Sequence, residues 1–119
     1  MRPLTPPAVA AYLDGLSRLP HPVLARIRAE GLAAGVPIVD ALTGALLHGL
    51  TRAVGATKVL EIGTAIGYST VWMATALPPA ALLVSLERDQ ARAAAARGSS
   101  PRPAATPNVR GPVSWGPTR

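Results

Sequence analysis

The 119-residue sequence contains no cysteine and no phenylalanine, and only 3% of its residues are aromatic. Without cysteine the chain has no disulfide framework, no thiolate metal site and no cysteine nucleophile. Only two histidines are present, His21 and His48, which disfavours a histidine-based metal site. Any hydrophobic core must therefore be built mainly from alanine, leucine, valine and isoleucine.

Long apolar runs are also missing. No run of 18 apolar residues occurs, so the sequence predicts no membrane span. Pro3, Pro6 and Pro7 interrupt the N-terminus, which therefore does not resemble a signal peptide. We expect a cytoplasmic protein with one small domain, because 119 residues with 49% hydrophobic content suffice for one core and not for two.

Acidic residues are absent from residues 90–119, which hold five arginines. Residues 1–89 hold seven basic and six acidic residues, so their net charge is +1. The overall net charge of +6 is thus a property of the end of the chain. Binding of nucleic acid by this basic tail is an alternative function, but Trp115 is the tail's only aromatic residue, which disfavours it.

Hydrophobic periodicity divides the chain into helices, two strands and a C-terminal tail. Three helices precede the first strand, and Asp40 is placed to cap the third of them. The first strand is almost wholly apolar, as in a parallel strand that is covered on both faces. The expected helices span residues 8–19, 22–34, 41–54, 69–77 and 90–97, and the expected strands span residues 58–62 and 82–86.

The composition changes at residue 98. Residues 98–119 contain five prolines and no leucine or isoleucine, so they bury too little apolar surface to offset their ordering entropy. We expect a disordered tail there, behind a folded unit of residues 1–97. Because GC-rich DNA read out of frame encodes such a composition, we hypothesise that the chain after about Arg97 results from a frameshift or an aberrant end. Resequencing the coding DNA would test this hypothesis.

The most informative stretch is an apolar strand that runs into a glycine-bearing turn and a helix, Val59-Leu60-Glu61-Ile62-Gly63-Thr64-Ala65-Ile66-Gly67-Tyr68-Ser69. The second apolar run, residues 82–86, ends in the acid Glu87. A strand, a glycine turn, a helix and an acid that ends the next strand describe a nucleotide-binding βαβ unit. The dinucleotide fingerprint needs glycine where this sequence has Glu61, which argues against NAD.

The residue types around this turn suggest the ligand. A carboxylate at Glu61 suits an ammonium group, and Gly63 lets the backbone approach the ligand. Ser69, at the start of the helix, can hold a carboxylate, and Glu87 can accept hydrogen bonds from both hydroxyls of a ribose. A ligand with ammonium, carboxylate and ribose groups is S-adenosylmethionine. Purely structural interpretations stay open: a packing turn, a structural acid at Glu61 and a solvated strand-end acid at Glu87.

The E-I-G-T-x-x-G-Y-S form of the turn resembles the first motif of class I S-adenosylmethionine-dependent methyltransferases, in particular the catechol and caffeoyl-CoA O-methyltransferase group. The resemblance covers about residues 35–97, and it includes Thr43-Gly44-Ala45-Leu46-Leu47 and Ala76-Leu77-Pro78. It implies an α/β, Rossmann-like methyltransferase fold with N-terminal helices, which here looks truncated after the second strand and its following helix.

The resemblance also implies a function, namely transfer of a methyl group from S-adenosylmethionine to a hydroxyl of a small-molecule acceptor. The family uses a divalent metal held by Asp and Asn residues further along the domain, but the last acid here is Asp89, so we identify no metal ligand and no catalytic residue. A homodimer through the N-terminal helices is a family expectation. A non-catalytic methyltransferase fragment is an alternative. The implied cofactor contacts are Glu61, Gly63, Ser69 and Glu87, and more weakly Val39.

Overall fold

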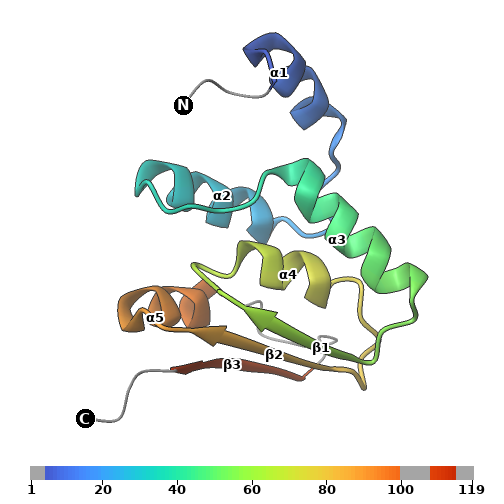
Figure 1. Cartoon of the computed structure of the whole chain (residues 1–119), viewed down its shortest axis with the longest axis vertical. Coiled ribbons are helices and arrows are strands. Elements are labelled where there is room, and N and C mark those ends of the chain that lie inside the picture. The colour runs from blue at the N-terminus through green and yellow to red at the C-terminus, as the bar shows by residue number, and fades with distance from the viewer. Residues whose placement is uncertain (1–4, 100–107, 115–119) are drawn as a thin grey trace.

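A computed structural model describes residues 5–99 and 108–114 of the chain (Figure 1). Strands and helices alternate after an N-terminal group of three helices. None of the described helices combines the length and the apolar character that a membrane crossing requires. The elements are α1 (Pro7–Leu16), α2 (Val23–Ala33), α3 (Ala41–Ala53), β1 (Lys58–Ile62), α4 (Tyr68–Ala74), β2 (Leu82–Glu87), α5 (Gln90–Ser99) and β3 (Asn108–Ser114).

The helices and the first two strands lie close to where the sequence predicts them. Asp40 caps α3 as expected, because its Oδ1 accepts a hydrogen bond of 2.7 Å from the Thr43 amide. Asp89 caps α5 in the same way, accepting from the Arg92 amide at 3.0 Å. Helix α4 is shorter than predicted and ends at Ala74.

The three strands form one parallel sheet in the order β1-β2-β3. Glu61 of β1 lies opposite Ser85 of β2, and Leu60 lies opposite Val84. The connection from β1 to β2 through α4 and the connection from β2 to β3 through α5 lead in the same direction across the sheet. Because such connections between parallel strands are right-handed, α4 and α5 lie on the same face of the sheet. This is the βαβ arrangement that the glycine turn predicts.

The third strand corrects two predictions. Part of the tail that was expected to be disordered forms β3, so the sheet does not stop after the second strand and its following helix. The prediction counted apolar side chains, whereas an edge strand is held largely by main-chain hydrogen bonds to its neighbour. The register shifts between Val84 and Leu86, opposite the segment with Gly111 and Pro112, and bulges of edge strands tolerate these residues. The rest of the expected tail, residues 100–107 and 115–119, lies outside the described residues.

The main hydrophobic core lies between the N-terminal helices and α4. Tyr68 and Trp72 of α4 are 1% and 2% exposed, and their rings pack edge to face with centroids 6.4 Å apart. Leu24 and Ile27 of α2 are fully buried in the same cluster. Both aromatic residues of α4 are therefore core residues.

Helix α3 approaches α4 closely at Gly44. A Cβ atom at Gly44 would lie only 2.3 Å from Nε1 of Trp72, so only glycine fits this contact without a shift. One turn later, His48 Nδ1 donates a hydrogen bond of 3.2 Å to the Trp72 carbonyl oxygen. The two contacts set the position of α3 over α4, and with it the position of residues 37–40, which lead into α3.

Only one face of the sheet is covered within the described residues. Leu83 and Ser85 of β2 are 0% and 1% exposed on the side of α4, whereas Leu60 and Ile62 of β1 are 64% and 82% exposed on the other side. The prediction that β1 is covered on both faces is therefore wrong for the part of the chain that the structure describes. The reason is topological, since α4 and α5 both follow right-handed crossovers to the same side.

Candidate functional site

The turn after β1 has an unusual backbone. Gly63 and Gly67 have φ angles of +94° and +87°, and Ala65 has a φ of +49°. The amides of Gly63 and Thr64 both donate to the Leu86 carbonyl oxygen, at 2.8 and 3.1 Å, which joins the carboxyl ends of β1 and β2. A Cβ atom at Gly63 would meet no atom within 4 Å, so the backbone there borders open space. Such an edge of a parallel sheet is where α/β proteins bind ligands.

Glu61 is held by hydroxyl groups inside the domain. Its side chain is buried, with 8% exposure. Ser69 Oγ donates to Oε1 at 2.6 Å, Thr70 Oγ1 donates to Oε2 at 2.5 Å, and Ser85 Oγ donates to the same Oε2. The carboxylate thus ties α4 to both strands, which supports the structural interpretation of Glu61. It also places a negative charge directly behind Ser69.

Sequence reasoning did not identify the hydroxyl partners of Glu61. Thr64 Oγ1 lies 2.5 Å from Ser85 Oγ, so Thr64 extends the network into the turn. Thr64, Thr70 and Ser85 are 2%, 5% and 1% exposed. A serine inside the apolar run of residues 82–86 was the available signal, because a buried hydroxyl needs a partner.

Glu87 is fixed at the end of β2. Its Oε2 accepts a hydrogen bond of 2.7 Å from the Ala65 amide, and its Oε1 accepts one of 2.9 Å from the Asp89 amide. The Asp89 amide is the main cause that holds the pKa of Glu87 below its ordinary value; the Ala65 amide acts in the same direction, and burial opposes both. With 9% exposure, Glu87 is not a solvated strand-end acid. It is an ionised carboxylate that anchors the glycine turn.

Three of the five predicted cofactor contacts meet in one small cavity of about 80 Å³. Val39 approaches from the segment before α3, Gly63 from the turn and Ser69 from α4. Glu61 and Glu87 do not line the cavity, but each is hydrogen-bonded to a residue that does. The residues that line it are Pro37, Ile38, Val39, Gly63, Thr64, Ala65, Tyr68 and Ser69.

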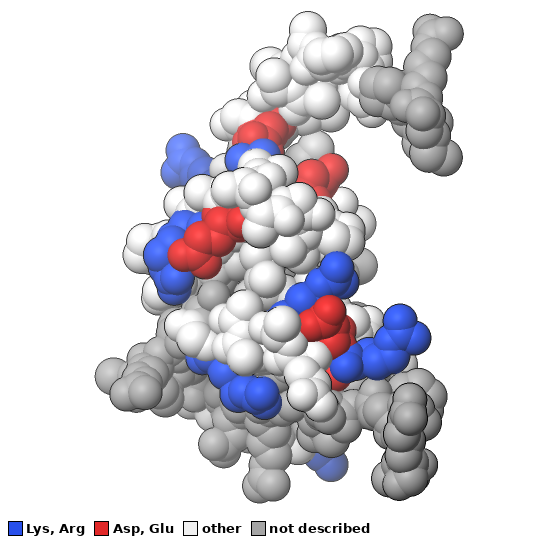
Figure 2. Space-filling view, turned by 90° about the vertical axis from the view of Figure 1, so that its left-hand side faces the viewer, with Lys and Arg blue, Asp and Glu red and all other residues white. Residues whose placement is uncertain are grey.

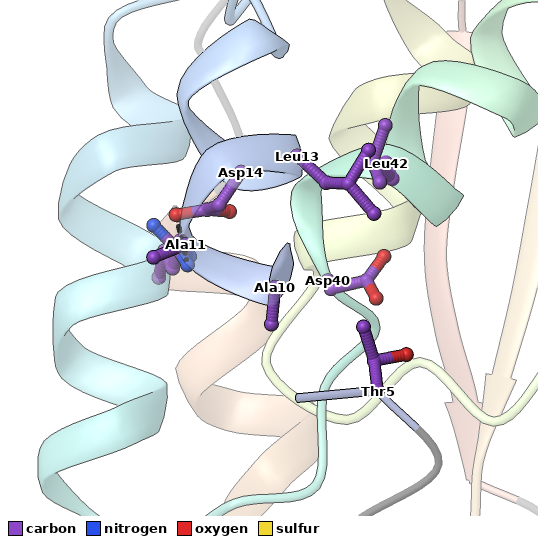
Figure 3. A pocket seen from close by; sticks show the side chains of 8 residues that line it. Thr5, Ala10, Ala11, Leu13, Asp14, Asp40 and Leu42 are labelled. Atoms are coloured by element: carbon purple, nitrogen blue, oxygen red, sulfur yellow. Dashed lines mark hydrogen bonds and ion pairs between the residues drawn. The ribbon is translucent and has the colours of Figure 1, made fainter. Parts of the chain in front are cut away.

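A larger cavity of about 390 Å³ lies between α1, α2 and the start of α3 (Figure 3). Leu13 and Leu42 form part of its apolar wall. Its charged groups are already paired: Asp14 of α1 binds Arg28 of α2 at 2.8 Å, and Asp40 caps α3. None of the predicted cofactor contacts lines this cavity, and we assign no ligand to it.

Charges of both signs lie side by side on the face that Figure 2 shows. Arg26 and Glu30 of α2 form an exposed ion pair of 2.9 Å. Within residues 5–99 and 108–114, no three side chains of histidine, cysteine, aspartate or glutamate group together as metal ligands. The described part of the chain therefore suggests neither a basic docking face in this view nor a metal centre.

Comparison with known proteins identifies the family. Residues 17–105 match the O-methyltransferase family, and the chain belongs to that family. A catechol O-methyltransferase of Mycobacterium tuberculosis is 40% identical over 94 residues, which are 77% of this chain and 43% of that protein. A catechol O-methyltransferase of Niastella koreensis is 40% identical over 78 residues, which are 64% of this chain and 35% of that protein.

Solved structures agree with the sequence comparison. The O-methyltransferase TomG of Streptomyces achromogenes, in complex with SAM, matches with a TM-score of 0.69 and 35% identity over 77% of this chain and 42% of that one. An O-methyltransferase of Bacillus cereus, in complex with SAH, matches with a TM-score of 0.69 and 33% identity over 77% and 43% of the two chains. The Rossmann-like methyltransferase fold is thereby confirmed, and the chain spans less than half the length of these relatives.

Acid should destabilise this protein partly through Glu87. Because its pKa is lowered in the folded state, its stabilising effect is complete above the unfolded-state pKa of about 4.3 and is lost as the pH falls through the lower folded-state value. We expect Glu87→Gln to reduce the decline of the free energy of unfolding below that pH, as measured by urea denaturation at a series of pH values. Part of the decline in the free energy of unfolding should remain in the Glu87→Gln variant, because the pKa of Asp40 is also lowered in the folded state.

The control for this measurement is Glu30→Gln, which removes an exposed carboxylate on α2. It should show the same pH dependence as the wild-type chain. If Glu87→Gln also kept the full wild-type decline, the turn would not depend on an ionised Glu87.

Proposed function

We propose that the loop between β1 and α4 binds S-adenosylmethionine and that the chain acts as the cofactor-binding part of an O-methyltransferase. The observation that carries this proposal is the cavity at the carboxyl end of β1, which Val39, Gly63 and Ser69 line between two fixed carboxylates. The family match supports it, as do the relatives whose structures were solved with SAM and SAH.

The chemistry of the cavity fits one end of this cofactor. The cavity of about 80 Å³ is smaller than the roughly 300–1,000 Å³ of typical ligand pockets, so it corresponds to one end of the ligand. The Ser69 hydroxyl donates its hydrogen bond to Glu61, so towards the cavity it can only accept hydrogen bonds. These acceptor lone pairs, together with the Glu61 carboxylate, favour a cationic group. We therefore assign Ser69 and Glu61 to the ammonium end of the ligand, which replaces the sequence-based expectation that Ser69 holds the carboxylate. Glu87, on the other side of the turn, is assigned to the ribose, because each carboxylate oxygen can accept more than one hydrogen bond.

Bound S-adenosylmethionine supplies a methyl group made electrophilic by its sulfonium. The residues of this chain would bind and orient it, and Gly63 would let the main chain lie against it. We derive no metal-assisted step and assign no general base. A small-molecule hydroxyl acceptor, a divalent metal and a homodimer follow from the family alone, and a cytoplasmic location remains our expectation.

Calorimetric titration with S-adenosylhomocysteine tests the proposal. The folded wild-type chain should bind it. Glu87→Gln should weaken binding about tenfold or more, because hydrogen bonds to a charged acceptor contribute about 1.5–3 kcal/mol and each 1.4 kcal/mol is a factor of ten. Glu30→Gln, an equal change of charge on α2, should bind like the wild type.

The outcomes separate the alternatives. A folded chain that ignores millimolar S-adenosylhomocysteine would overturn the proposal and favour the non-catalytic fragment. Binding that Glu87→Gln leaves unchanged would refute the role of Glu87 alone. A steep salt dependence of binding to DNA or RNA would instead support the basic-tail alternative.

A further inference from the structure

Tyr68 lines the small cavity at the glycine turn and has a buried hydroxyl group without a partner. The residue is 1% exposed, and its Oη forms no hydrogen bond within residues 5–99 and 108–114. Buried polar groups are almost always hydrogen-bonded, because leaving one unpaired destabilises the folded chain. An unpaired hydroxyl in the lining of a cavity therefore points to a ligand that completes the bond.

The ring of Tyr68 is held in place by the hydrophobic core. It packs edge to face on Trp72, and it belongs to the same cluster as Leu24 and Ile27. The side chains of these three neighbours carry no oxygen that could accept a hydrogen bond. Because the core already fixes the ring, a bond between its hydroxyl and a ligand would cost little side-chain entropy.

The other two hydroxyl groups of the lining already donate their protons inside the protein. Ser69 donates to Glu61. Ser85 also donates to Glu61, so in the contact of 2.5 Å between Thr64 and Ser85 the proton must come from Thr64. Thr64 and Ser69 can thus only accept hydrogen bonds from a ligand. Among the lining side chains, only Tyr68 keeps a hydroxyl proton that it can donate to a ligand.

The proposed cofactor has an ammonium group and a carboxylate at the same end. The acceptors Thr64 and Ser69 suit the ammonium, which leaves the carboxylate without a donor. The amides of Gly63, Thr64 and Ala65, which also border the cavity, already donate within the protein. We propose that the hydroxyl of Tyr68 binds the carboxylate of S-adenosylmethionine. This inference rests on the proposed function and adds a specificity-determining residue to it.

The arrangement also selects one orientation of the ligand. A carboxylate placed against Ser69 would face acceptor lone pairs with the charge of Glu61 behind them, and it would be repelled. Placed against Tyr68, the same carboxylate meets a donor. The cavity therefore distinguishes the two charged groups of the amino-acid end by the direction of its hydroxyl protons.

Calorimetric titration of Tyr68→Phe with two ligands tests the proposal. The substitution keeps the ring and removes only the hydroxyl. It should weaken binding of S-adenosylhomocysteine about tenfold or more, because a hydrogen bond to a charged group is lost. Decarboxylated S-adenosylhomocysteine, which keeps the ammonium group and the ribose, should bind to Tyr68→Phe as it does to the wild type. Glu87→Gln should weaken binding of both ligands.

The stability of the same variant separates a binding role from a structural one. Because the hydroxyl has no partner in the described structure, Tyr68→Phe should unfold at the same urea concentration as the wild type or at a higher one. A hydroxyl with a structural role would give a lower urea midpoint and an equal loss of affinity for both ligands. That result would contradict the proposal.

Fluorine NMR of the chain labelled with 3-fluorotyrosine covers the case in which Tyr68→Phe fails to fold. The chain has two tyrosines, and Tyr12 of α1, which is 67% exposed, serves as the reference signal. S-Adenosylhomocysteine should shift the signal of Tyr68, whereas the decarboxylated ligand should leave it nearly unchanged. Neither ligand should shift the signal of Tyr12.

The outcomes distinguish this inference from the proposed function. A folded wild type that binds neither ligand would overturn the proposed function, and the role of Tyr68 with it. A wild type that binds S-adenosylhomocysteine no better than Tyr68→Phe does, or a Tyr68 signal that responds equally to both ligands, would refute the role of Tyr68 alone.

Discussion

Replacing Glu61 by alanine should lower the free energy of unfolding by about 2–4 kcal/mol, since it removes a charged acceptor and leaves buried hydroxyls without a partner. Glu61 accepts hydrogen bonds from Ser69, Thr70 and Ser85, and thereby connects α4 with β1 and β2. Urea denaturation at neutral pH, followed by circular dichroism, measures the loss.

Glu30→Ala is the control for this variant. Glu30 forms an exposed pair with Arg26 within one helix, and such pairs contribute at most about 0.5 kcal/mol. If Glu61→Ala were as stable as Glu30→Ala, the hydroxyl network would not hold the sheet and α4 together. The result would then leave ligand binding as the main role of this acid.

Gly44→Ala should lower the free energy of unfolding by about 1–3 kcal/mol, because an added methyl group would overlap Trp72 in a packed core. The new Cβ would lie 2.3 Å from Trp72 Nε1, so α3 must move away from α4. Thermal and urea denaturation measure the stability. Because α3 also positions Val39 at the small cavity, we expect the same variant to weaken binding of S-adenosylhomocysteine.

Gly49→Ala provides a matched control in the same helix. A Cβ atom at Gly49 would meet nothing within 4 Å, so the helix-forming preference of alanine should raise stability by up to about 1 kcal/mol. Equal stability of the two variants would mean that α3 and α4 tolerate a wider separation than the structure indicates.

Local patterns were enough to predict much of the fold. The strand over residues 58–62, the helix cap at Asp40 and the glycine turn follow from short-range preferences that hardly depend on distant contacts. The third strand was missed for the opposite reason. Its main-chain hydrogen bonds come from β2, which is more than twenty residues away in sequence, and composition alone does not reveal such a partner.

The candidate site shows the same division. The residue types at Gly63, Ser69 and Glu87 predicted a cofactor-binding loop. Val39 was predicted only from the resemblance to the methyltransferase family. The structure brings Val39 to the same cavity as Gly63 and Ser69. The partners of the two carboxylates were not predictable. Ser85 reaches Glu61 only because the parallel register sets the two residues opposite each other.

By itself, the sequence determined the order of the helices and the first two strands, the glycine turn and the acids that flank it, because each depends on residues a few positions apart. Only the tertiary structure decided that Glu61 is held by three hydroxyls, that Glu87 anchors the turn, that residues 108–114 form a third strand and that no described helix covers one face of the sheet. These features arise from contacts between distant segments, and strand register, crossover handedness and close packing at Gly44 select those contacts.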